Sequence, residues 1–421
     1  MEQRIIYHID VNSAFLSWEA CYRIHHLGGK TDLREQVAVV GGDVTMRHGI
    51  ILAKSIPAKT YNIKTGESIL EAKQKCPELI IVPPNYNMYE QCSAAFINIL
   101  REYSDMVEQY SIDEAFVDMT STCHLFGTPE EVAYIIKNRI RDELGFTVNV
   151  GISSNKLLAK MASDFKKPDR VHTLYPEEIE RKMWPLSVSD LFFVGRATTK
   201  KLFTMGIHTI GELAKCDSAW LRTILNKQGE VIWNFANGID LSPVISTPPA
   251  NKGYGNSTTT PFDVTDSDTA KTVLLALAET VGKRLRKDDV RIKVISVGIR
   301  FTDLSYCSHQ KIISTATNIT KEIYKIAGEV FDELWNGCPI RHLGIHTGKV
   351  QEDDFMRQLS FFDEIDYEKL VAVDRTIDEI RERFGSDSVK RAVFISGSVD
   401  HMSGGISREK RTVDYSKMKI E

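Results

Sequence analysis

The sequence has few cysteines, no long apolar run and no excess of charge of either sign, and each shortage excludes a class of protein. The seven cysteines are odd in number, scattered and without a C-x-x-C pair, which argues against a disulfide framework and against structural zinc. No stretch approaches the roughly 18 consecutive apolar residues of a membrane span. Asp10 comes too early for the apolar core of a signal peptide. We therefore expect a soluble, cytoplasmic chain with reduced thiols and no membrane partner.

The charges nearly balance: 53 Lys and Arg against 57 Asp and Glu give a formal net charge of −4. Net charge alone predicts no polyanionic partner, so any nucleic-acid surface must be a local patch. Apolar residues make up 42% of the chain, which together with glycine lies in the ordinary globular range and excludes global disorder and fibrous folds. A chain of 421 residues is too long for one typical domain of roughly 150 residues, so we expect several domains.

The first part of the chain shows strand and helix patterns with acidic residues between them. The predicted elements are a strand at 4–11, a helix from residue 12, a hairpin at 106–119, a helix at 128–144, a strand at 147–152 and a helix at 155–165. The helix at 128–144 has proline near its start and ends before Gly145. This order predicts an α+β core with an antiparallel component.

The second part begins with short helices punctuated by glycine, from 176 to 240. Adjacent prolines at 248 and 249 resist both helix and central strand, so an extended linker is expected there. Beyond it we predict a helix at 267–288, a strand at 290–301, a strand at 311–315, a helix at 319–334 and a strand at 340–350. This pattern is typical of a second, smaller α+β domain.

Three acidic residues stand at the ends of predicted elements: Asp10 alone, and Asp113 beside Glu114. Neighbouring strand residues face opposite sides, so Asp113 and Glu114 can serve one site only if the hairpin bends or bulges between them. Clustered carboxylates repel one another unless cations neutralise them. Two Mg²⁺ ions roughly 3.5–4 Å apart would do so, activating a 3′-hydroxyl and stabilising a departing pyrophosphate. Asp10 by itself is more simply explained as a solvated strand end, so this interpretation depends on the full set.

Three segments together resemble the Y-family translesion DNA polymerases. They are Asp10-Val11-Asn12-x-x-Phe15, Ser111-Ile112-Asp113-Glu114-Ala115-Phe116, and the run from Gly151-Ile152-Ser153-Ser154-Asn155-Lys156 to Lys167-Pro168. Their order and spacing are specific, and the resemblance extends to about residue 350. It implies an α+β multidomain, right-hand polymerase with an α/β palm, small fingers, a helical thumb and a βαββαβ-like little finger.

The resemblance also implies limits for these domains. The palm is expected at 1–20 and 77–176, the fingers at 21–76, the thumb with a helix-hairpin-helix at 177–240, a linker at 241–251, the little finger at 252–350 and a C-terminal segment at 351–421. The implied activity is that of a DNA-directed DNA polymerase of the error-prone translesion class. Such an enzyme transfers deoxynucleotides to a primer 3′ end during DNA damage tolerance, without proofreading.

By the same resemblance, Asp10, Asp113 and Glu114 are the catalytic residues. Together with the backbone carbonyl of Val11 they would hold two Mg²⁺ ions as cofactors. Phe15 falls where the family places an aromatic ring against the sugar of the incoming nucleotide, and a ring there leaves no room for a ribose 2′-hydroxyl. A core phenylalanine is the simpler alternative outside this motif.

Two lysines are assigned to the incoming deoxynucleoside triphosphate. Lys167, just before Pro168, matches a triphosphate-binding lysine of the family, and a solvated helix-end lysine is its alternative. Many members carry Tyr-x-x-Arg in the fingers, and here Ile56 replaces the tyrosine and Lys59 the arginine. The positive charge is kept, but not the bidentate hydrogen bonding of an arginine.

Other positions bear on the branch of the family or stay unassigned. Asn12 replaces a second aspartate, and with Ile56 and residues 252–257 it favours the polymerase V-like branch of Gram-positive bacteria. Lys156 and Lys160, one helical turn apart, are left unassigned because surface charge explains them equally well.

Two regions are expected to hold primer–template DNA. Gly195 and Gly206 lie in a stretch that resembles the family's helix-hairpin-helix, whose backbone N–H groups can hold phosphates, although a plain helical hairpin remains an alternative. The predicted basic patch of the little finger consists of Lys283, Arg284, Arg286, Lys287, Arg291 and Arg300. A solvated helix face is the alternative for this patch.

Residues 358–362 resemble the short peptide with which bacterial polymerases bind the sliding clamp. Leu359 and the two rings of Phe361 and Phe362 can fill an apolar groove, with Gln358 at the start of the motif. A segment folded back on its own domain is the alternative. Residues 367–384 are predicted to form a charged helix. We expect a monomer, and an accessory subunit of the SOS response stays an open partner.

Two rival functions remain open at this stage. One is a non-catalytic DNA-binding or clamp-associated regulator that retains the polymerase fold, against which the intact acid trio argues. The other is a cyclase-like palm that acts on free nucleotides, although such an enzyme needs neither a thumb nor a clamp peptide. Primer extension distinguishes the first rival, and template-independent formation of a cyclic nucleotide distinguishes the second.

Overall fold

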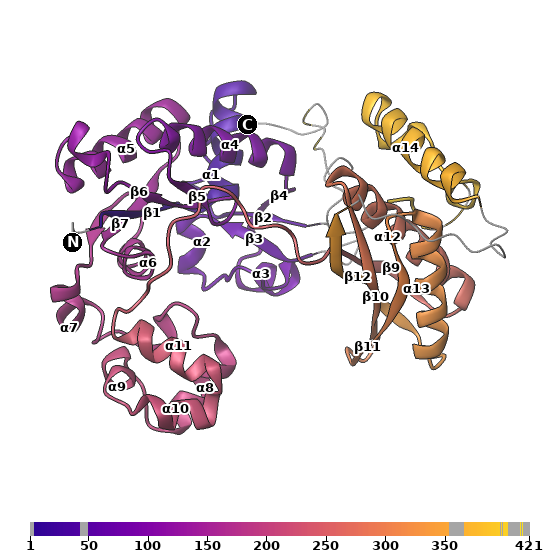
Figure 1. The fold of residues 1–421 in the computed structure, drawn as a ribbon. Helices are drawn as coiled ribbons and strands as arrows, with labels where there is room; N and C mark the ends of the chain where they lie inside the picture. The colour runs from indigo at the N-terminus through magenta and orange to yellow at the C-terminus, as the bar shows by residue number, and fades with distance from the viewer. Residues whose placement is uncertain are drawn as a thin grey trace.

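The computed structural model describes residues 4–42, 49–352, 366–395, 397, 399–402, 413 and 415. Its strands form three sheets of five, four and three strands, and a group of short helices lies apart from the sheets (Figure 1). The five-stranded sheet, the four-stranded sheet and the helical group each have a large cluster of buried apolar residues, and the three-stranded sheet has a smaller one. The expectation of a multidomain chain is therefore confirmed.

The five-stranded sheet has the order β5-β6-β1-β7-β8, with β1 at its centre. Its strands are β1 (Ile6–Val11), β5 (Val107–Gln109), β6 (Glu114–Asp118), β7 (Val148–Ser153) and β8 (Val171–Thr173). Helices α4 (Tyr86–Arg101) and α5 (Pro129–Leu144) lie on one face, and α6 (Lys156–Asp164) lies on the other (Figure 1). Strand β1 pairs antiparallel with both β6 and β7, as the predicted antiparallel component requires.

Local sequence explains why α5 has the bounds that the pattern predicts. The side chains of Thr128 and Glu131 form a reciprocal capping box, and Pro129 occupies the first turn. Gly145 ends the helix with φ of 79°, a left-handed conformation that glycine adopts without steric cost.

A close approach between β7 and α6 brings the helix to the centre of the sheet. A Cβ atom at Gly151 would lie 2.0 Å from the carbonyl oxygen of Ala159 and 2.5 Å from the amide nitrogen of Ser163. Only glycine leaves room for this contact. Lys160 of α6 consequently lies beside Asp10 at the end of β1.

The three-stranded sheet has the order β3-β2-β4, formed by β2 (Ala38–Gly41), β3 (Ile51–Lys54) and β4 (Ile80–Val82), with the short helices α2 (Ile56–Thr60) and α3 (Ile69–Lys75). One predicted domain limit cuts through a helix, and another separates a strand from its sheet. Helix α1 (Ala14–His26) continues across the limit after residue 20, and β4 lies beyond the limit at 76 although it pairs with β2. Fingers limits at 21–76 therefore exclude one strand of the small sheet.

The helical group contains α8 (Arg196–Thr204), α9 (Ile210–Ala214), α10 (Ser218–Leu225) and α11 (Lys227–Ala236), and α7 (Ile179–Lys182) leads into it. The chain then crosses the five-stranded sheet before it enters the last sheet (Figure 1). Val244 is buried in a small cluster with Ile6, Phe116 and Ala159, so the beginning of this linker is attached to the sheet.

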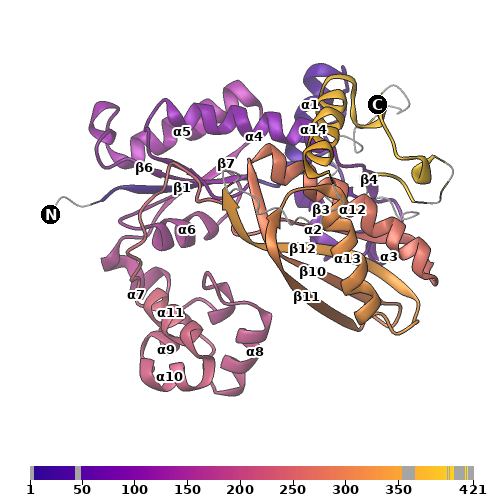
Figure 2. The same cartoon turned by 45° about the vertical axis from the view of Figure 1, so that its right-hand side comes forward.

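The four-stranded sheet has the order β11-β10-β12-β9, and α12 (Ser267–Lys287) and α13 (Thr320–Leu334) cover one of its faces (Figure 2). With β9 (Gly255–Val264), β10 (Val290–Phe301), β11 (Tyr306–Thr317) and β12 (Ile340–Glu352), the element order is the expected βαββαβ. Strand β11 begins five residues before the predicted strand at 311–315, and the pattern alone had assigned no strand to β9.

Helix α14 (Tyr367–Phe384) packs against α12, and this contact corrects one predicted DNA contact (Figure 1). Arg286 donates from Nε to Asp378 at 2.6 Å and from Nη1 to Asp374 at 3.1 Å, and its side chain is 8% exposed. The prediction that Arg286 belongs to a DNA-binding surface is therefore wrong, because the acidic residues of α14 cover it. Among the residues that the structure describes, no helix is long and apolar enough to cross a bilayer.

Candidate active site

The side chains of Asp10 and Glu114 lie on paired strands at the end of the five-stranded sheet. Asp10 on β1 is directly opposite Glu114 on β6, and Asp10 is 7% exposed. Antiparallel residues that face each other project to the same side of the sheet. The structure therefore brings two of the three predicted acidic residues together across one strand pair.

The third acid, Asp113, lies in the bend that precedes β6. Its backbone carbonyl accepts a hydrogen bond from the amide of Val11 at 3.0 Å, and its carboxylate accepts one from Ser111 Oγ at 2.6 Å. Residues 111–113 form bends rather than strand. The bend that the sequence required between Asp113 and Glu114 is present, and it places Asp113 beside Asp10 and Val11.

Two lysines contact these carboxylates. Lys160 Nζ lies 2.7 Å from Glu114 Oε1 and 3.8 Å from Asp10 Oδ2. Lys167 Nζ lies 2.9 Å from Asp10 Oδ1 and 2.9 Å from Asp164 Oδ1. Lys167 is exposed, and its ammonium group lies at the acid cluster, so both its assigned role and the alternative of a solvated lysine stay predictions.

Lys160 is a site residue that the sequence left unassigned. Its residue exposure is 8%, so it is not surface charge. Its neighbour Lys156 pairs instead with Glu108 at 2.7 Å and lies over the ring of Phe116. Lys160 lies on the side of α6 that packs against the sheet, and the close contact at Gly151 fixes which side of the helix this is. Knowing that side would have predicted a role for Lys160.

Burial and the neighbouring charges shift the acids in opposite directions. Burial raises the pKa of the Asp10 carboxyl above its usual range, although Lys167 acts against this shift. Burial also acts to raise the pKa of Glu114, but the neighbouring His8 and Asp10 lower it below its usual range. Glu114 is therefore the readily ionised member of the pair, and Asp10 is the member that gains most from an added cation.

His8 is a second residue that the sequence did not single out. It is fully buried, its Nδ1 lies 2.7 Å from Ser163 Oγ, and its Nε2 lies 3.9 Å from Glu114 Oε2. Burial lowers the pKa of His8 to about 4, so the imidazole is neutral. Among the described residues, His8 Nε2 has no hydrogen-bond partner.

Phe15 lies on α1, one turn from the end of β1. Its ring stacks on Tyr89 of α4 with centroids 4.6 Å apart and planes 7° apart, and Tyr86 approaches its edge at 6.1 Å. Phe15 is partly buried against the core, and part of its surface stays accessible. These contacts fix the ring in position. A fixed ring is what the predicted role of Phe15, limiting the size of a neighbouring sugar, requires.

Lys59 and Ile56 lie on α2, beside the three-stranded sheet, and both are exposed. Among the described residues, the ammonium groups that pair with the carboxylates of Asp10 and Glu114 are those of Lys160 and Lys167. Their assignment to the incoming nucleotide therefore stays a prediction.

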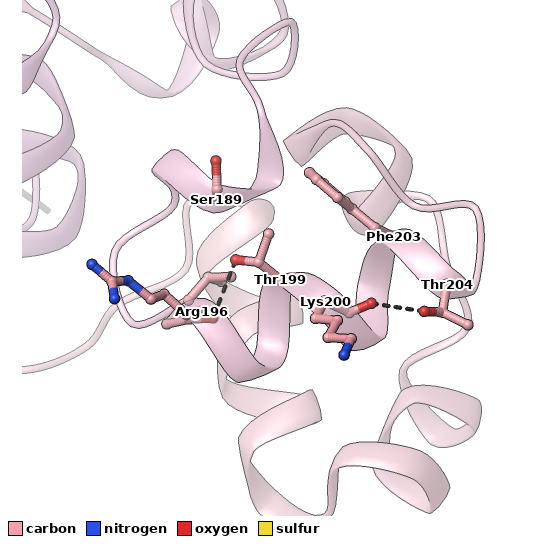
Figure 3. A pocket seen from close by; sticks show the side chains of 8 residues that line it. Ser189, Arg196, Thr199, Lys200, Phe203 and Thr204 are labelled. Atoms are coloured by element: carbon pink, nitrogen blue, oxygen red, sulfur yellow. Dashed lines mark hydrogen bonds between the residues drawn. The ribbon is translucent and has the colours of Figure 1, made fainter. Parts of the chain in front are cut away.

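Gly195 and Gly206 flank α8 in the helical group. Gly195 is the residue before the helix, and Gly206 follows it with φ of 78°, a left-handed value that favours glycine. Beside them is an open hollow of about 740 Å³ (Figure 3). The hollow is lined by Ser189, Val194, Gly195, Arg196, Thr199, Lys200, Phe203 and Thr204. Two cations and three hydroxyl groups beside an apolar ring match the groups of a sugar–phosphate chain.

The remaining basic residues of the predicted patch differ in exposure and in contacts. Arg284 donates to the carbonyl oxygen of Gly255 and lies over the ring of Tyr254, while Lys287 and Arg300 are exposed. Lys283 and Arg291 are half-buried and take part in further interactions. Binding of DNA by these residues stays a prediction. The clamp-binding residues Gln358, Leu359, Phe361 and Phe362 lie outside the described residues.

Three family models match separate parts of the chain. Residues 9–164 match the impB/mucB/samB family, and residues 251–361 match the C-terminal domain of the same family. Residues 189–240 match the thumb domain described for DNA polymerase-iota. The first range covers most of the five-stranded sheet and the whole three-stranded sheet, the second covers the four-stranded sheet, and the third covers the helical group.

Curated relatives match the chain over nearly its full length. DNA polymerase IV of Clostridium acetobutylicum is 43% identical over 93% of this chain and 98% of the relative. DNA polymerase IV of Acetivibrio thermocellus is 39% identical, over 93% and 98%. The chain belongs to the Y family of DNA polymerases.

A solved Y-family structure agrees with this assignment. The Y-family DNA polymerase chimera Dbh-Dpo4(243-245)-Dbh has a TM-score of 0.71 and 22% identity, and covers 83% of this chain and 99% of that chain. The fold is thus that of a right-hand Y-family polymerase: the five-stranded sheet is the palm, the three-stranded sheet the fingers, the helical group the thumb and the four-stranded sheet the little finger. The relatives named above are called polymerase IV, so the polymerase V-like branch stays a prediction.

Proposed function

We propose that this chain is a template-directed DNA polymerase of the translesion class, which adds deoxynucleotides to a primer 3′ end during DNA damage tolerance. The observation that carries the proposal is the pairing of Asp10 with Glu114, beside Asp113, in the palm of a Y-family fold. Relatives named DNA polymerase IV support the same activity. No proofreading step is part of the proposal.

The residues of the acid cluster fit two Mg²⁺ ions. Carboxylate and carbonyl oxygens are the donors that magnesium prefers, and Lys160 Nζ lies within 4 Å of both Asp10 and Glu114, which indicates that these oxygens attract a cation. Asp10, Asp113, Glu114 and the carbonyl of Val11 would hold the ions. When bound, the ions would supply Lewis-acid activation of the primer hydroxyl and neutralise the departing pyrophosphate.

The other residues of the site would bind and orient the nucleotide. Lys167 is close enough to Asp10 to exchange that partner for a phosphate oxygen, and it would then neutralise the triphosphate. The ring of Phe15, fixed by Tyr89, would exclude a ribose 2′-hydroxyl. The thumb hollow beside Arg196 and Lys200 would hold the backbone of the DNA duplex.

Primer extension across a defined lesion tests this proposal. With Mg²⁺ and deoxynucleotides the protein should extend a primer, and Asp113→Asn should lower the rate about 1000-fold, equivalent to roughly 4 kcal/mol of barrier, because a metal ligand is lost. Asp105→Asn, an exposed acid before β5, is the matched control. Affinity for DNA should remain in both variants.

Two results would contradict the proposal. A protein that binds primer–template DNA but extends no primer would be a DNA-binding regulator with a polymerase fold. Full activity of Asp113→Asn would remove Asp113 from the metal site. Clamp binding, an accessory subunit and the monomeric state are further expectations that need their own binding measurements.

A further inference from the structure

Phe193, which lies three residues before α8, has a backbone conformation that is unfavourable for its side chain. Its φ is 72°, a left-handed value that costs a bulky residue free energy and that glycine adopts freely. The loop around it is well hydrogen-bonded: the amide of Val194 donates to the carbonyl of Leu191, and Gln228 Nε2 donates to the carbonyl of Phe193. Glycine would satisfy the same loop, so a phenylalanine here needs another reason.

The ring of Phe193 is only partly used inside the protein. It packs edge-on against Phe192 with centroids 4.7 Å apart and against Phe235 at 5.6 Å, yet the residue stays 54% exposed. Its contacts hold the ring in one orientation and leave one side of it in water. A fixed, exposed ring on a strained residue is typical of a contact surface.

This ring belongs to a row of aromatic side chains that leads to the acid cluster. Phe192 lies 6.2 Å from Tyr110 of the palm, and Tyr110 lies 5.5 Å from Phe116. The amide of Tyr110 donates to the carbonyl of Glu114 at 3.0 Å, so Tyr110 is part of the hairpin that carries the acids. Tyr110 is 45% exposed. The row therefore has two exposed rings: Tyr110 on the palm hairpin that carries the acids, and Phe193 on the thumb.

At its other end the row reaches the hollow beside α8. Val194 and Gly195, the two residues after Phe193, line that hollow together with Arg196 and Lys200 (Figure 3). A partner that crosses this surface must offer apolar groups to the rings, next to negative charges for the cations. The backbone of duplex DNA has this alternation, because deoxyribose is its apolar part and phosphate its anionic part.

We propose that the exposed rings of Phe193 and Tyr110 pack against deoxyribose groups of the primer strand, between the acid cluster and the α8 hollow. This inference rests on the proposed polymerase function. The contact is independent of sequence, since sugars carry no base information. It positions the DNA without adding charge, and the strained backbone of Phe193 serves to present the ring to the DNA.

Four variants separate the ring from the shape of the loop. Phe193→Ala removes the ring and keeps the strain, Phe193→Gly removes both, and Phe193→Tyr keeps both. As a control, Phe384→Ala removes a more exposed ring (74%) at the end of α14. Affinity is measured by fluorescence anisotropy of a labelled primer–template hairpin at several salt concentrations. Thermal unfolding is followed for each variant.

The Ala and Gly variants of Phe193 should raise the Kd for DNA by a similar factor, about fivefold, which corresponds to roughly 1 kcal/mol. The slope of affinity against salt should not change, because no cation is lost. The Gly variant should unfold about 2 °C above the Ala variant, because glycine tolerates the positive φ. The Tyr variant and Phe384→Ala should bind DNA like the unmodified protein.

Two outcomes would overturn the inference. If Phe193→Gly binds DNA as tightly as the unmodified protein while Phe193→Ala does not, the residue only shapes the loop. If all variants keep the original Kd, the ring has no contact with DNA. Primer extension by the unmodified protein is measured in parallel: its absence refutes the proposed function, whereas its presence with unchanged Kd values refutes only this contact.

Discussion

Among single residues, Lys160 best explains how the folded protein tolerates buried carboxylates so close together. It lies 2.7 Å from Glu114 and 3.8 Å from Asp10, and its side chain is 10% exposed. Removing one partner of a buried ion pair leaves charge without compensation, which costs more than the pair itself contributes. Lys160 therefore stabilises the palm when no metal ion is bound.

Lys160→Met should lower the free energy of unfolding by about 3 kcal/mol in the presence of a chelator. Added Mg²⁺ should restore part of this loss, because a cation that binds only the folded state stabilises it. Thermal unfolding with and without Mg²⁺ checks both statements. Lys156→Met, one turn earlier and paired with Glu108, is the control and should show no such rescue by Mg²⁺. Equal stability of Lys160→Met and the unmodified protein in chelator would contradict the prediction.

Phe15 is the residue that should decide the sugar of the nucleotide. Phe15→Ala should lower the preference for deoxynucleotides over ribonucleotides about 30-fold, equivalent to roughly 2 kcal/mol, because the ring that excludes the 2′-hydroxyl is gone. The ratio of kcat/KM for the two substrates measures this preference. An unchanged ratio would mean that Phe15 is only a core residue stacked on Tyr89.

At this scale the sequence identified the acids but not their neighbours. Asp10, Asp113 and Glu114 were found because motif and element ends coincide. Strand pairing sets Asp10 opposite Glu114, and the backbone of Asp113 bonds to that of Val11. Lys160 and His8 were not found, because their roles depend on which side of α6 and β1 faces the sheet partner. That choice is made by packing between distant segments, which a single helical turn does not reveal.

At the scale of elements, the contact of α6 with β7 positions the two ammonium groups of the site, Lys160 on the helix and Lys167 just after it. Gly151→Ala would put a Cβ atom 2.0 Å from the carbonyl of Ala159, so the helix would have to move. We expect a loss of about 3 kcal/mol of stability, with a further loss of activity as Lys160 leaves Glu114. Chemical denaturation and primer extension measure the two effects.

A second glycine provides the control for this prediction. Gly328 lies inside α13 and has open space around its missing Cβ atom. Gly328→Ala should stabilise the protein by up to about 1 kcal/mol, because alanine favours a helix. If Gly151→Ala were as well tolerated as Gly328→Ala, the close packing of α6 would not be what holds the site together.

Elements with strong local signals were predicted well, and those held by tertiary contacts were not. Helix α5 has a capping box, proline and glycine at its ends, and its bounds were predicted. The basic residues at the end of α12 were taken as a surface, but Asp374 and Asp378 of α14 bind Arg286. The charge pattern of a helix shows that it needs polar partners, and it does not tell whether water or another helix provides them.

For the molecule as a whole, the described residue Tyr415 joins the C-terminal segment to the first helix. Its hydroxyl donates to Glu19 Oε2 at 2.9 Å and accepts from Asn85 Nδ2 at 3.2 Å. Its ring lies 5.2 Å from that of Tyr22, and the Arg23 guanidinium is 6.0 Å from its centre. Glu19 is fully buried, so Tyr415 completes the hydrogen bonding of a carboxylate that would otherwise rely on Arg23. The chain thus has two attachments near the palm on either side of the little finger: the linker on the five-stranded sheet and Tyr415 on α1.

Loss of the Tyr415 contacts should increase the radius of gyration of the molecule and lower its free energy of unfolding only slightly. Tyr415→Ala removes both the hydroxyl and the ring, and we expect a loss of about 1–2 kcal/mol from the unpaired acceptor on Glu19. The little finger would then be held to the palm mainly by the linker, and small-angle X-ray scattering should show a larger radius of gyration. Tyr415→Phe keeps the ring against Tyr22 and Arg23, so its radius of gyration should lie between those of Tyr415→Ala and the unmodified protein. Identical scattering of Tyr415→Ala and the unmodified protein, with and without DNA, would mean that the linker and direct contacts alone fix the little finger.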